Sequence, residues 1–422
     1  MATLPNLPEW VKVEHEVAKL LTQQEIHGWC FDVTAARQLE ASLQEELEET
    51  REAIRRQHAF VQGEEKTPKR DNKRQGYIKG ATFTRIKETN PTSRDHIAWI
   101  LQTFHGWTPT MTTATGKPII DEPVLKEIGS PISMMFLKCL TVTKMLGMLS
   151  QGVNAWLKLV TKSKIHHHCS VATSTHRCAH RHPNLAQVNS DERFRKLFIP
   201  SPGQLMVGAD LSGIELRMLS HYLARHDGGR YADILLNGDI HQVNADKIGI
   251  SRKLVKTVTY AFLYGAGDEK IGLSYDKQLS SSSAKRKGKE IRQAYIEAIE
   301  GLDSLLAAIK LAAERGYVYA IDQRKILLDS PHKALNYLLQ SGAGTVAKKW
   351  MLLNNDHIKE LQLCCSQLAF IHDELQFECH PEHSKDLCSS LVLAATEAGE
   401  SYGMRVRIDA EATIGKNWSE TH

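Results

Sequence analysis

The sequence lacks the features that mark several large classes of protein. No apolar run among its 422 residues reaches the ~18 residues of a membrane span, and the polar N-terminus does not resemble a signal peptide. The eight cysteines are scattered, with one adjacent pair at Cys364 and Cys365 and no CxxC motif. This pattern favours reduced thiols in a cytoplasm over a disulfide framework.

A large excess of charge of one sign is also missing. The sequence has 53 Lys and Arg against 49 Asp and Glu, which is a formal net charge of +4. Binding to nucleic acid would therefore require cations clustered locally, because the chain as a whole is only mildly basic. With 42% hydrophobic and 24% charged residues, the composition predicts a globular protein whose core is divided among two or three subdomains.

Acidic residues interrupt two apolar runs that are typical of buried strands. Asp210 ends the run 205–210 where a helical pattern begins, and Asp373 and Glu374 interrupt the run 370–377. A buried carboxylate costs free energy unless it is paired or binds a metal. Taken singly, a helix cap and a solvated turn are sufficient explanations. Taken together, the acids predict a site that holds divalent cations for phosphate chemistry.

A segment between these acids predicts a helix over 251–264, with Ser251 as its N-cap and Gly265 at its end. Its polar residues recur every four positions, a step of about 40°, so they share one face. These residues are Arg252, Lys256, Tyr260 and Tyr264. Cations near a helix start suit a triphosphate, and aromatics further along suit stacking. A solvated basic face with tyrosines in the core is the alternative.

Together these segments resemble the three polymerase motifs of the DNA polymerase I family. Asp210–Arg217 resembles the first motif, Arg252–Gly265 the second, and His372–Glu374 the third. The likeness extends with interruptions from about Glu9 to His422, and it is greatest to the replicative DNA polymerases of short-tailed bacteriophages. That subgroup is indicated by Asn237–His241, Phe262–Lys270 and Ser330–Ser341.

The resemblance implies an α+β right-hand fold with a helical thumb, an antiparallel-sheet palm and helical fingers. The expected boundaries are 1–160 for the thumb, 161–236 and 326–422 for the two parts of the palm, and 237–325 for the fingers. His27–Asp32 resembles the junction at which the thumb begins in full-length relatives. We therefore expect the proofreading exonuclease domain of the family to be absent.

By the same resemblance, the reaction is template-directed addition of deoxynucleotides to a primer 3′-hydroxyl with two Mg²⁺ ions. The resemblance assigns the ions to Asp210 and Asp373, with Glu374 in a supporting position, and assigns protonation of the leaving group to Lys256. The residues expected to bind the nucleotide are Arg252, Lys256, Tyr260, His241 and Glu215. Those expected to contact DNA are Arg177, Gln187, Tyr264, Asn336, Gln340 and His372. A hydrogen bond from Tyr260 to Glu215 is expected to exclude the 2′-hydroxyl of a ribonucleotide.

Two positions depart from the family pattern, because relatives have glycine where this chain has His176 and Gln323. Glycine tolerates backbone conformations that other residues rarely adopt, so the departure at His176 bears on the local backbone geometry. His176 also belongs to a stretch rich in histidine and cysteine, 165–182, that could suggest zinc. The spacing matches no closed Cys/His template, and adjacent residues cannot all point at one ion. We therefore expect no zinc site there.

Residues 57–89 show no periodicity and are locally basic. Eight cations face four acids in this stretch: Lys66, Lys69, Arg70, Lys73, Arg74, Lys79, Arg85 and Lys87 against Glu64, Glu65, Asp71 and Glu88. We expect a thumb loop that touches the DNA backbone, since clustered cations gain affinity by counterion release. A solvated loop is the alternative. Similar phage enzymes bind host thioredoxin through an insertion at this place, but this stretch is shorter and thioredoxin is the less favoured partner.

Primer-template DNA and dNTPs are the expected partners, in the host cytoplasm if a phage encodes the chain. A separate exonuclease, a helicase-primase and a processivity factor are further candidates, and no membrane partner is expected. Two other functions remain open: a single-subunit RNA polymerase, and a catalytically dead DNA-binding protein. Glu215 beside Tyr260 resembles a deoxy-selective pair, which disfavours the first. The presence of every motif residue disfavours the second.

Overall fold

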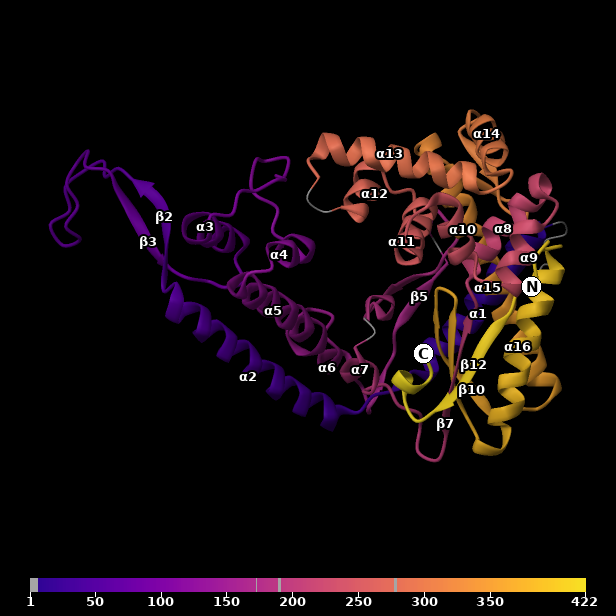
Figure 1. Cartoon of the computed structure of the whole chain (residues 1–422). Coiled ribbons are helices and arrows are strands. Elements are labelled where there is room, and N and C mark those ends of the chain that lie inside the picture. The colour runs from indigo at the N-terminus through magenta and orange to yellow at the C-terminus, as the bar shows by residue number, and fades with distance from the viewer. Residues whose placement is uncertain (1–6, 172, 189–190, 277–278) are drawn as a thin grey trace. The chain divides into compact units, whose positions relative to one another are not determined.

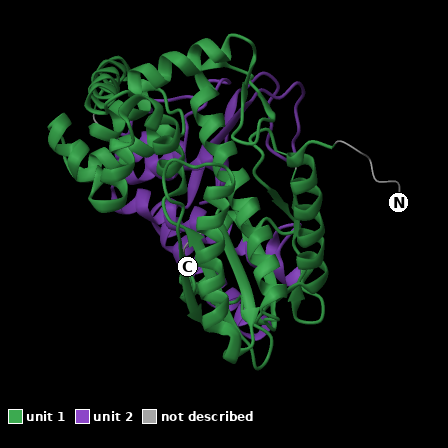
Figure 2. Ribbon diagram, turned by 90° about the vertical axis from the view of Figure 1, so that its right-hand side faces the viewer, with its two compact units in different colours: residues 1–32, 159–422 green, residues 33–158 purple. Residues whose placement is uncertain are grey.

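The computed structural model describes residues 7–171, 173–188, 191–276 and 279–422. The chain divides into two compact units, shown in Figure 2. Unit 1 comprises Met1–Asp32 and Leu159–His422, and unit 2 comprises Val33–Lys158. Helices and strands are mixed, as the predicted α+β class requires (Figure 1).

Unit 1 is built on a four-stranded antiparallel sheet with the strand order β10-β11-β7-β12. Its strands are β7 (Leu205–Leu211), β10 (Cys365–Ile371), β11 (Glu374–Cys379) and β12 (Ala410–Gly415). The central strands β7 and β11 are buried along almost their whole length because both faces of the sheet are largely covered. Strand β7 is mainly apolar, whereas polar Glu374, Gln376 and Glu378 alternate with apolar residues along β11. The sheet predicted to carry Asp210 beside Asp373 and Glu374 is therefore present.

Long helices pack around this sheet and form one hydrophobic core with it. They are α1 (Glu9–His27), α8 (Ile214–Asp227), α15 (Ala334–Glu360) and α16 (Ser384–Ser401). Gly342 on α15 lies against Met218 on α8, and a Cβ at this glycine would lie 2.3 Å from Met218 Cε, so the methionine side chain would have to move. The indole of Trp350 on α15 donates a 2.8 Å hydrogen bond to the carbonyl oxygen of Leu391 on α16.

Helix α1 lies in unit 1, although the predicted thumb boundary of 1–160 separates it from the palm. Its apolar stripe, Val13, Val17 and Leu21, is buried in the core that contains the sheet. The stripe was visible in the sequence, but its packing partners are more than a hundred residues away. The predicted boundaries, at 1–160, 161–236, 237–325 and 326–422, remain predictions.

The segment predicted as fingers is a set of helices in which two glycines allow very close packing. A Cβ on Gly272 would lie 1.9 Å from the carbonyl oxygen of Ala284, and one on Gly288 would lie 1.7 Å from that of Asp268. The backbones of α12 and α13 therefore touch directly. The helices here are α10 (Ile240–Ile248), α11 (Arg252–Leu263), α12 (Asp268–Tyr275), α13 (Ser281–Ala298) and α14 (Leu302–Ala313), and α9 (Arg230–Asn237) precedes them.

Shorter elements complete unit 1. The strand pairs are β1 (Trp29–Cys30) with β4 (Lys164–Ile165), β5 (His168–Ser170) with β6 (Ala179–Arg181), and β8 (Tyr317–Tyr319) with β9 (Lys325–Leu327). The short helices are α6 (Trp156–Leu159, at the unit boundary), α7 (Glu192–Arg195), η2 (Leu185–Gln187), η3 (Pro331–Lys333), η4 (Pro381–His383) and η5 (Trp418–Glu420).

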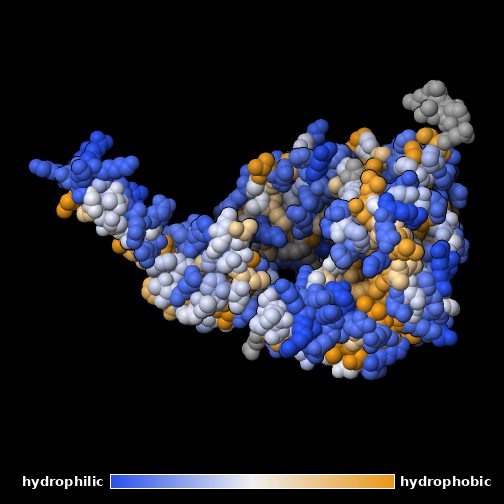
Figure 3. All heavy atoms as spheres, turned by 90° about the horizontal axis from the view of Figure 1, so that it is seen from above, coloured by the Kyte–Doolittle hydropathy of each residue, from blue (hydrophilic) through white to orange (hydrophobic). Residues whose placement is uncertain are grey.

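Unit 2 is mainly helical but contains a β-hairpin where the sequence predicted an irregular loop. Strands β2 (Phe60–Lys66) and β3 (Phe83–Glu88) pair within 57–89. The prediction was wrong here because the ladder is almost entirely solvent-exposed, with Val61 its one buried side chain, so no apolar alternation marked it. Figure 3 shows mainly hydrophilic residues over the outer end of this hairpin.

The helices of unit 2 are α2 (Val33–Gln57), α3 (Arg94–His105), α4 (Glu122–Ile128), α5 (Pro131–Leu146) and the π-turn η1 (Gly147–Gln151). By length and composition alone, the helical stretch Pro131–Leu159 could cross a membrane. A buried core helix passes the same test, and the apolar residues of α5 pack against α2 and α4.

Candidate active site

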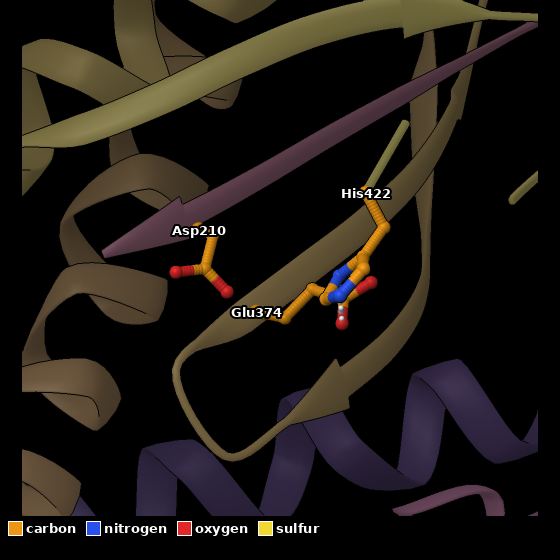
Figure 4. A group of neighbouring side chains, drawn as sticks. All are labelled: Asp210, Glu374 and His422. Atoms are coloured by element: carbon orange, nitrogen blue, oxygen red, sulfur yellow. Dashed lines mark ion pairs between the residues drawn. The ribbon is translucent and has the colours of Figure 1, made fainter. Parts of the chain in front are cut away.

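Asp210 and Asp373 are brought together by the register of the sheet. Glu374 lies directly opposite Asp210 across β11 and β7, and the amide of Leu211 donates a 3.0 Å hydrogen bond to the carbonyl oxygen of Asp373. Opposite residues on antiparallel strands point to the same face. Figure 4 shows Asp210 and Glu374 on that face, with His422 beside them.

The two aspartates are costly to ionise in this environment. Burial raises the pKa of Asp210 to about 7, and the nearby carboxylates of Asp373 and Glu374 act in the same direction. Burial raises the pKa of Asp373 to about 6, with Glu215 as the next cause. A divalent cation would relieve both the desolvation and the repulsion, and carboxylate oxygens are the ligands that Mg²⁺ prefers. The donor set therefore fits the predicted metal ions.

Glu374 is held by three polar partners on the C-terminal segment and on β11. Its Oε1 accepts hydrogen bonds from Trp418 Nε1 at 2.5 Å and from Gln376 Nε2 at 2.8 Å, while His422 Nδ1 lies 2.9 Å from Oε2. The ligand atoms of Asp210, Glu374 and His422 lie within 4.8 Å of one another, so this group could also hold an ion. The partners of Glu374 agree with a supporting position.

Sequence reasoning missed Trp418 and His422 as neighbours of the acids. They arrive because the C-terminal segment packs over β7 at Gly208, where a Cβ would lie 2.3 Å from the carbonyl oxygen of Thr421. Thr421 Oγ1 also donates a 2.8 Å hydrogen bond to Gln376 Oε1. A glycine within a buried strand is a signal of close backbone approach, and Gly208 was available as that signal.

Glu215 in the first turn of α8 joins three of the predicted site segments. Its Oε1 accepts hydrogen bonds from Arg177 Nη2 at 2.9 Å and from the Tyr264 hydroxyl at 3.0 Å. The expected partner was Tyr260, and the structure replaces it with Tyr264. Tyr264 is the C-cap residue of α11, one turn beyond Tyr260, so its position at the helix end brings the hydroxyl to α8.

Helix α11 presents its predicted face near α10. The Ser251 side chain caps the helix by accepting from the Leu254 amide. Arg252 Nε donates a 2.7 Å hydrogen bond to Asp239 Oδ2. The centroid of the His241 ring lies 6.2 Å from that of the Tyr260 ring. Burial lowers the pKa of His241; the charges of Lys256 and Arg252 act in the same direction, and that of Asp239 acts against them.

The predicted DNA-contacting residues are only partly gathered around the carboxylates. His372 directly precedes Asp373, and its ring centroid lies 5.9 Å from that of His180. Asn336 Nδ2 donates a 2.9 Å hydrogen bond to the carbonyl oxygen of Leu263, so this amide supports the end of α11. Gln340 is half-buried on α15, and Gln187 is exposed on η2.

The two positions that depart from the family pattern both have the backbone of a glycine. His176 has φ +60° and Gln323 has φ +67°, in the left-handed region that L side chains rarely adopt. His176 and Gln323 thus carry side chains in a backbone conformation that favours glycine. The nearby Cys169 and Cys178 are buried and reduced, and the residues described in 165–182 form no three-ligand metal group.

The raised aspartate pKa values predict a stability cost that metal offsets. A carboxyl with a folded-state pKa above its unfolded value contributes stability at low pH, and this contribution is lost as pH rises, here from about 4 to about 7. In metal-free protein at pH 8, Asp210→Asn should therefore melt a few degrees above the wild type.

This difference should shrink at pH 5, and Mg²⁺ at pH 8 should raise the melting temperature of the wild type more than that of the variant. Thermal unfolding with and without chelator measures each quantity, with exposed Asp303→Asn as the control. A metal-free variant that is no more stable than wild type at pH 8 would contradict the electrostatic argument.

Comparison with known proteins confirms the resemblance drawn from the motifs. A model of DNA polymerase family A matches residues 61–420. The DNA-directed DNA polymerases of Enterobacteria phage T3 and Escherichia phage T7 are each 31% identical over 503 residues, covering 98% of this chain and 70% of theirs. The solved POL domain of Pol1 from M. smegmatis, in complex with DNA primer-template and dNTP, has a TM-score of 0.77 at 21% identity, covering 97% of this chain and 70% of that one. The chain therefore belongs to DNA polymerase family A, and it is a DNA-directed DNA polymerase as its phage relatives are.

Proposed function

We propose that this polymerase adds deoxynucleotides to a primer 3′-hydroxyl in phage DNA replication, with two Mg²⁺ ions held by Asp210 and Asp373. The observation that carries the proposal is the pair of half-buried carboxylates on adjacent elements of the palm sheet, both with raised pKa values. When bound, such ions make the primer hydroxyl a better nucleophile and neutralise charge on the pyrophosphate. Glu374, held by its three partners, keeps the turn in place.

The residues of α10 and α11 are proposed to bind the triphosphate. Arg252 and Lys256 lie near the N-terminal end of α11, where the helix dipole also favours anions. Arg252 Nε donates a 2.7 Å hydrogen bond to Asp239 in an exposed ion pair, so the guanidinium lies beside the start of α10. His241 is assigned to the same ligand, and Lys256 Nζ is the group proposed to protonate the leaving pyrophosphate.

Several residues of unit 1 are proposed to contact the primer-template. The proposal assigns Arg177 and His372 to the primer end, Tyr264 to the stack of bases, and Gln187, Asn336 and Gln340 to the minor groove. Its support is that Arg177, Tyr264 and His372 lie beside Asp373 or share Glu215. The M. smegmatis structure with the same fold contains DNA primer-template and dNTP.

The exposed hairpin of β2 and β3 is proposed to bind the DNA backbone. Lys66 lies 4.2 Å from the centroid of the Tyr77 ring, and Tyr77 stacks on Phe83 with ring centroids 5.2 Å apart, so the long connection has internal order. We propose no 3′→5′ exonuclease activity for these 422 residues. A separate exonuclease, a helicase-primase or a processivity factor would act with the chain in the host cytoplasm, thioredoxin being less favoured.

Removing either metal-binding charge should abolish synthesis. Asp210→Asn and Asp373→Asn keep the side-chain volume but lose the charge, so primer extension should fall at least about a hundredfold while DNA affinity changes little. Single-nucleotide extension and fluorescence anisotropy with labelled primer-template measure the two quantities. Asp303→Asn, on the exposed face of α14, is the matched control. Extension within about tenfold of wild type would show that the ions are held elsewhere.

Selection of the sugar should depend on Glu215 and on the hydroxyl that holds it. Tyr264→Phe removes the hydrogen bond to Glu215, which is a bond to a charged group, and should lower the ratio of kcat/KM for dNTP over NTP by about tenfold. Glu215→Ala should lower this ratio further. Tyr260→Phe is the comparison that separates the observed hydrogen bond from the expected one. An unchanged ratio in all three variants would place the selection elsewhere.

The hairpin should contribute to DNA affinity through its charge. Replacing Lys69, Arg70, Lys73 and Arg74 by Gln keeps the strands and should weaken primer-template binding. The slope of log affinity against log salt should become shallower by about 0.9 for each DNA phosphate that the variant no longer neutralises. Lys310→Gln is the control, because Lys310 is exposed on α14. If the slope is unaltered, the hairpin does not touch DNA.

A further inference from the structure

The loop 173–177 carries Arg177 to the active site in a tightly closed turn. The amide of His176 donates a 3.1 Å hydrogen bond to the carbonyl oxygen of Thr173, and Thr173 Oγ1 donates a 2.6 Å hydrogen bond to that of Arg177. His176 adopts φ +60°, which favours glycine. A histidine in this conformation carries a conformational cost, so a compensating interaction of its side chain is to be expected.

The His176 side chain makes such an interaction with α15. Its Nδ1 and the Oγ of Ser341 form a 2.7 Å hydrogen bond, and Ser341 is fully buried. Burial lowers the pKa of His176 to about 4, and the nearby Arg324 guanidinium acts in the same direction. The ring is therefore neutral at physiological pH, and the contact is a hydrogen bond between neutral groups in a largely dry environment.

The part of α15 beneath this loop has small residues on the side that faces the loop, and a buried ion pair anchors it to α1. A Cβ on Gly344 would lie 3.3 Å from both Arg177 Cγ and the His176 carbonyl oxygen, so the loop rests directly on the helix. One turn further along α15, Lys348 is fully buried, and its Nζ lies 2.7 Å from Glu14 Oε1 on α1. The same oxygen accepts from Arg324 Nη1 at 2.6 Å.

The second departure from the family pattern adjoins this buried cluster of charges. Gln323 stands between Asp322 and Arg324, whose side chains form a 2.6 Å ion pair. Asp322, Arg324, Lys348 and Glu14 are also the charges that act on the pKa of His176. The cluster ties α1, α15 and the β8–β9 turn into one support. Separating one member from such a buried group would leave the other charges uncompensated, which costs free energy and therefore disfavours movement of the support.

We infer that His176 is a positioning residue for primer binding: its hydrogen bond to Ser341 fastens the loop to α15 and so presents Arg177 to the primer terminus. A glycine at this position would leave the turn unanchored and free to sample other conformations. With His176 the loop is ordered before DNA arrives, so less entropy is lost on binding. The inference rests on the proposed contact between Arg177 and the primer.

The test compares His176→Gly, Ser341→Ala and the double variant in single-nucleotide insertion. Glycine accepts φ +60°, so His176→Gly should fold, which a melting curve verifies. We expect KM for primer-template to rise about fivefold in each single variant, with kcat within about twofold of wild type. The double variant should be no worse than the worse single variant, because both changes remove one interaction.

Gln362→Gly is the matched control, because Gln362 is exposed and also has positive φ, at +54°. It should leave KM for primer-template unchanged. If His176→Gly resembles this control, or if the effects of His176→Gly and Ser341→Ala multiply in the double variant, the inference is wrong.

Arg177→Ala separates this inference from the proposed function. It should raise KM for primer-template, and adding His176→Gly to it should have no further effect, because the anchor acts through Arg177. An unchanged KM in Arg177→Ala would refute the proposed primer contact itself. A raised KM in Arg177→Ala, followed by an independent rise of about fivefold on adding His176→Gly, would refute only the positioning role.

Discussion

The candidate active site depends on the electrostatic cost of placing two half-buried aspartates beside each other. The carboxyls of Asp210 and Asp373 have raised pKa values because burial and the repulsion of neighbouring carboxylates both disfavour their ionised forms. Only a rigid scaffold can hold such groups together without metal. The antiparallel register of β7 and β11, and the 3.0 Å hydrogen bond from the Leu211 amide to the Asp373 carbonyl, provide that scaffold.

Helix α15 links this site to the rest of unit 1. At its first turns Asn336 supports the end of α11, and at its middle Ser341 and Gly344 support the Arg177 loop. One turn later Lys348 joins the buried cluster that includes Glu14. A single helix thus sets the positions of residues proposed to bind the nucleotide and the primer. A change in its packing would therefore affect both sets together.

Glu215 is where groups proposed to bind the nucleotide and groups proposed to bind the primer meet. Its Oε1 accepts from Arg177 and from Tyr264, so one carboxylate orients a cation and an aromatic from distant parts of the chain. Both hydrogen bonds involve a charged acceptor at a half-buried position, which makes them stronger than neutral ones. Either donor could be drawn away by DNA or nucleotide, and the remaining bond would still hold the carboxylate.

The sequence by itself predicted which residues could carry the chemistry of the site, because that information is local, and it determined the family. The periods of strand and helix were enough to predict that Asp210 ends a buried strand and that the residues spaced by four from Arg252 to Tyr264 share one face of a helix. The family and its α+β fold followed from the order of the motifs. The hairpin of β2 and β3 was not predicted, because an exposed ladder has no apolar side to alternate.

Only the tertiary structure decided which side chains meet. The hydrogen bond of Tyr264, in place of Tyr260, depends on how α11 ends against α8. The partners Trp418 and His422 of Glu374, and the bond between His176 and Ser341, join residues that are far apart in the sequence. Periodicity shows which face a residue occupies on its own element. It cannot show which other element packs there, because that choice is set by the summed packing of the whole core.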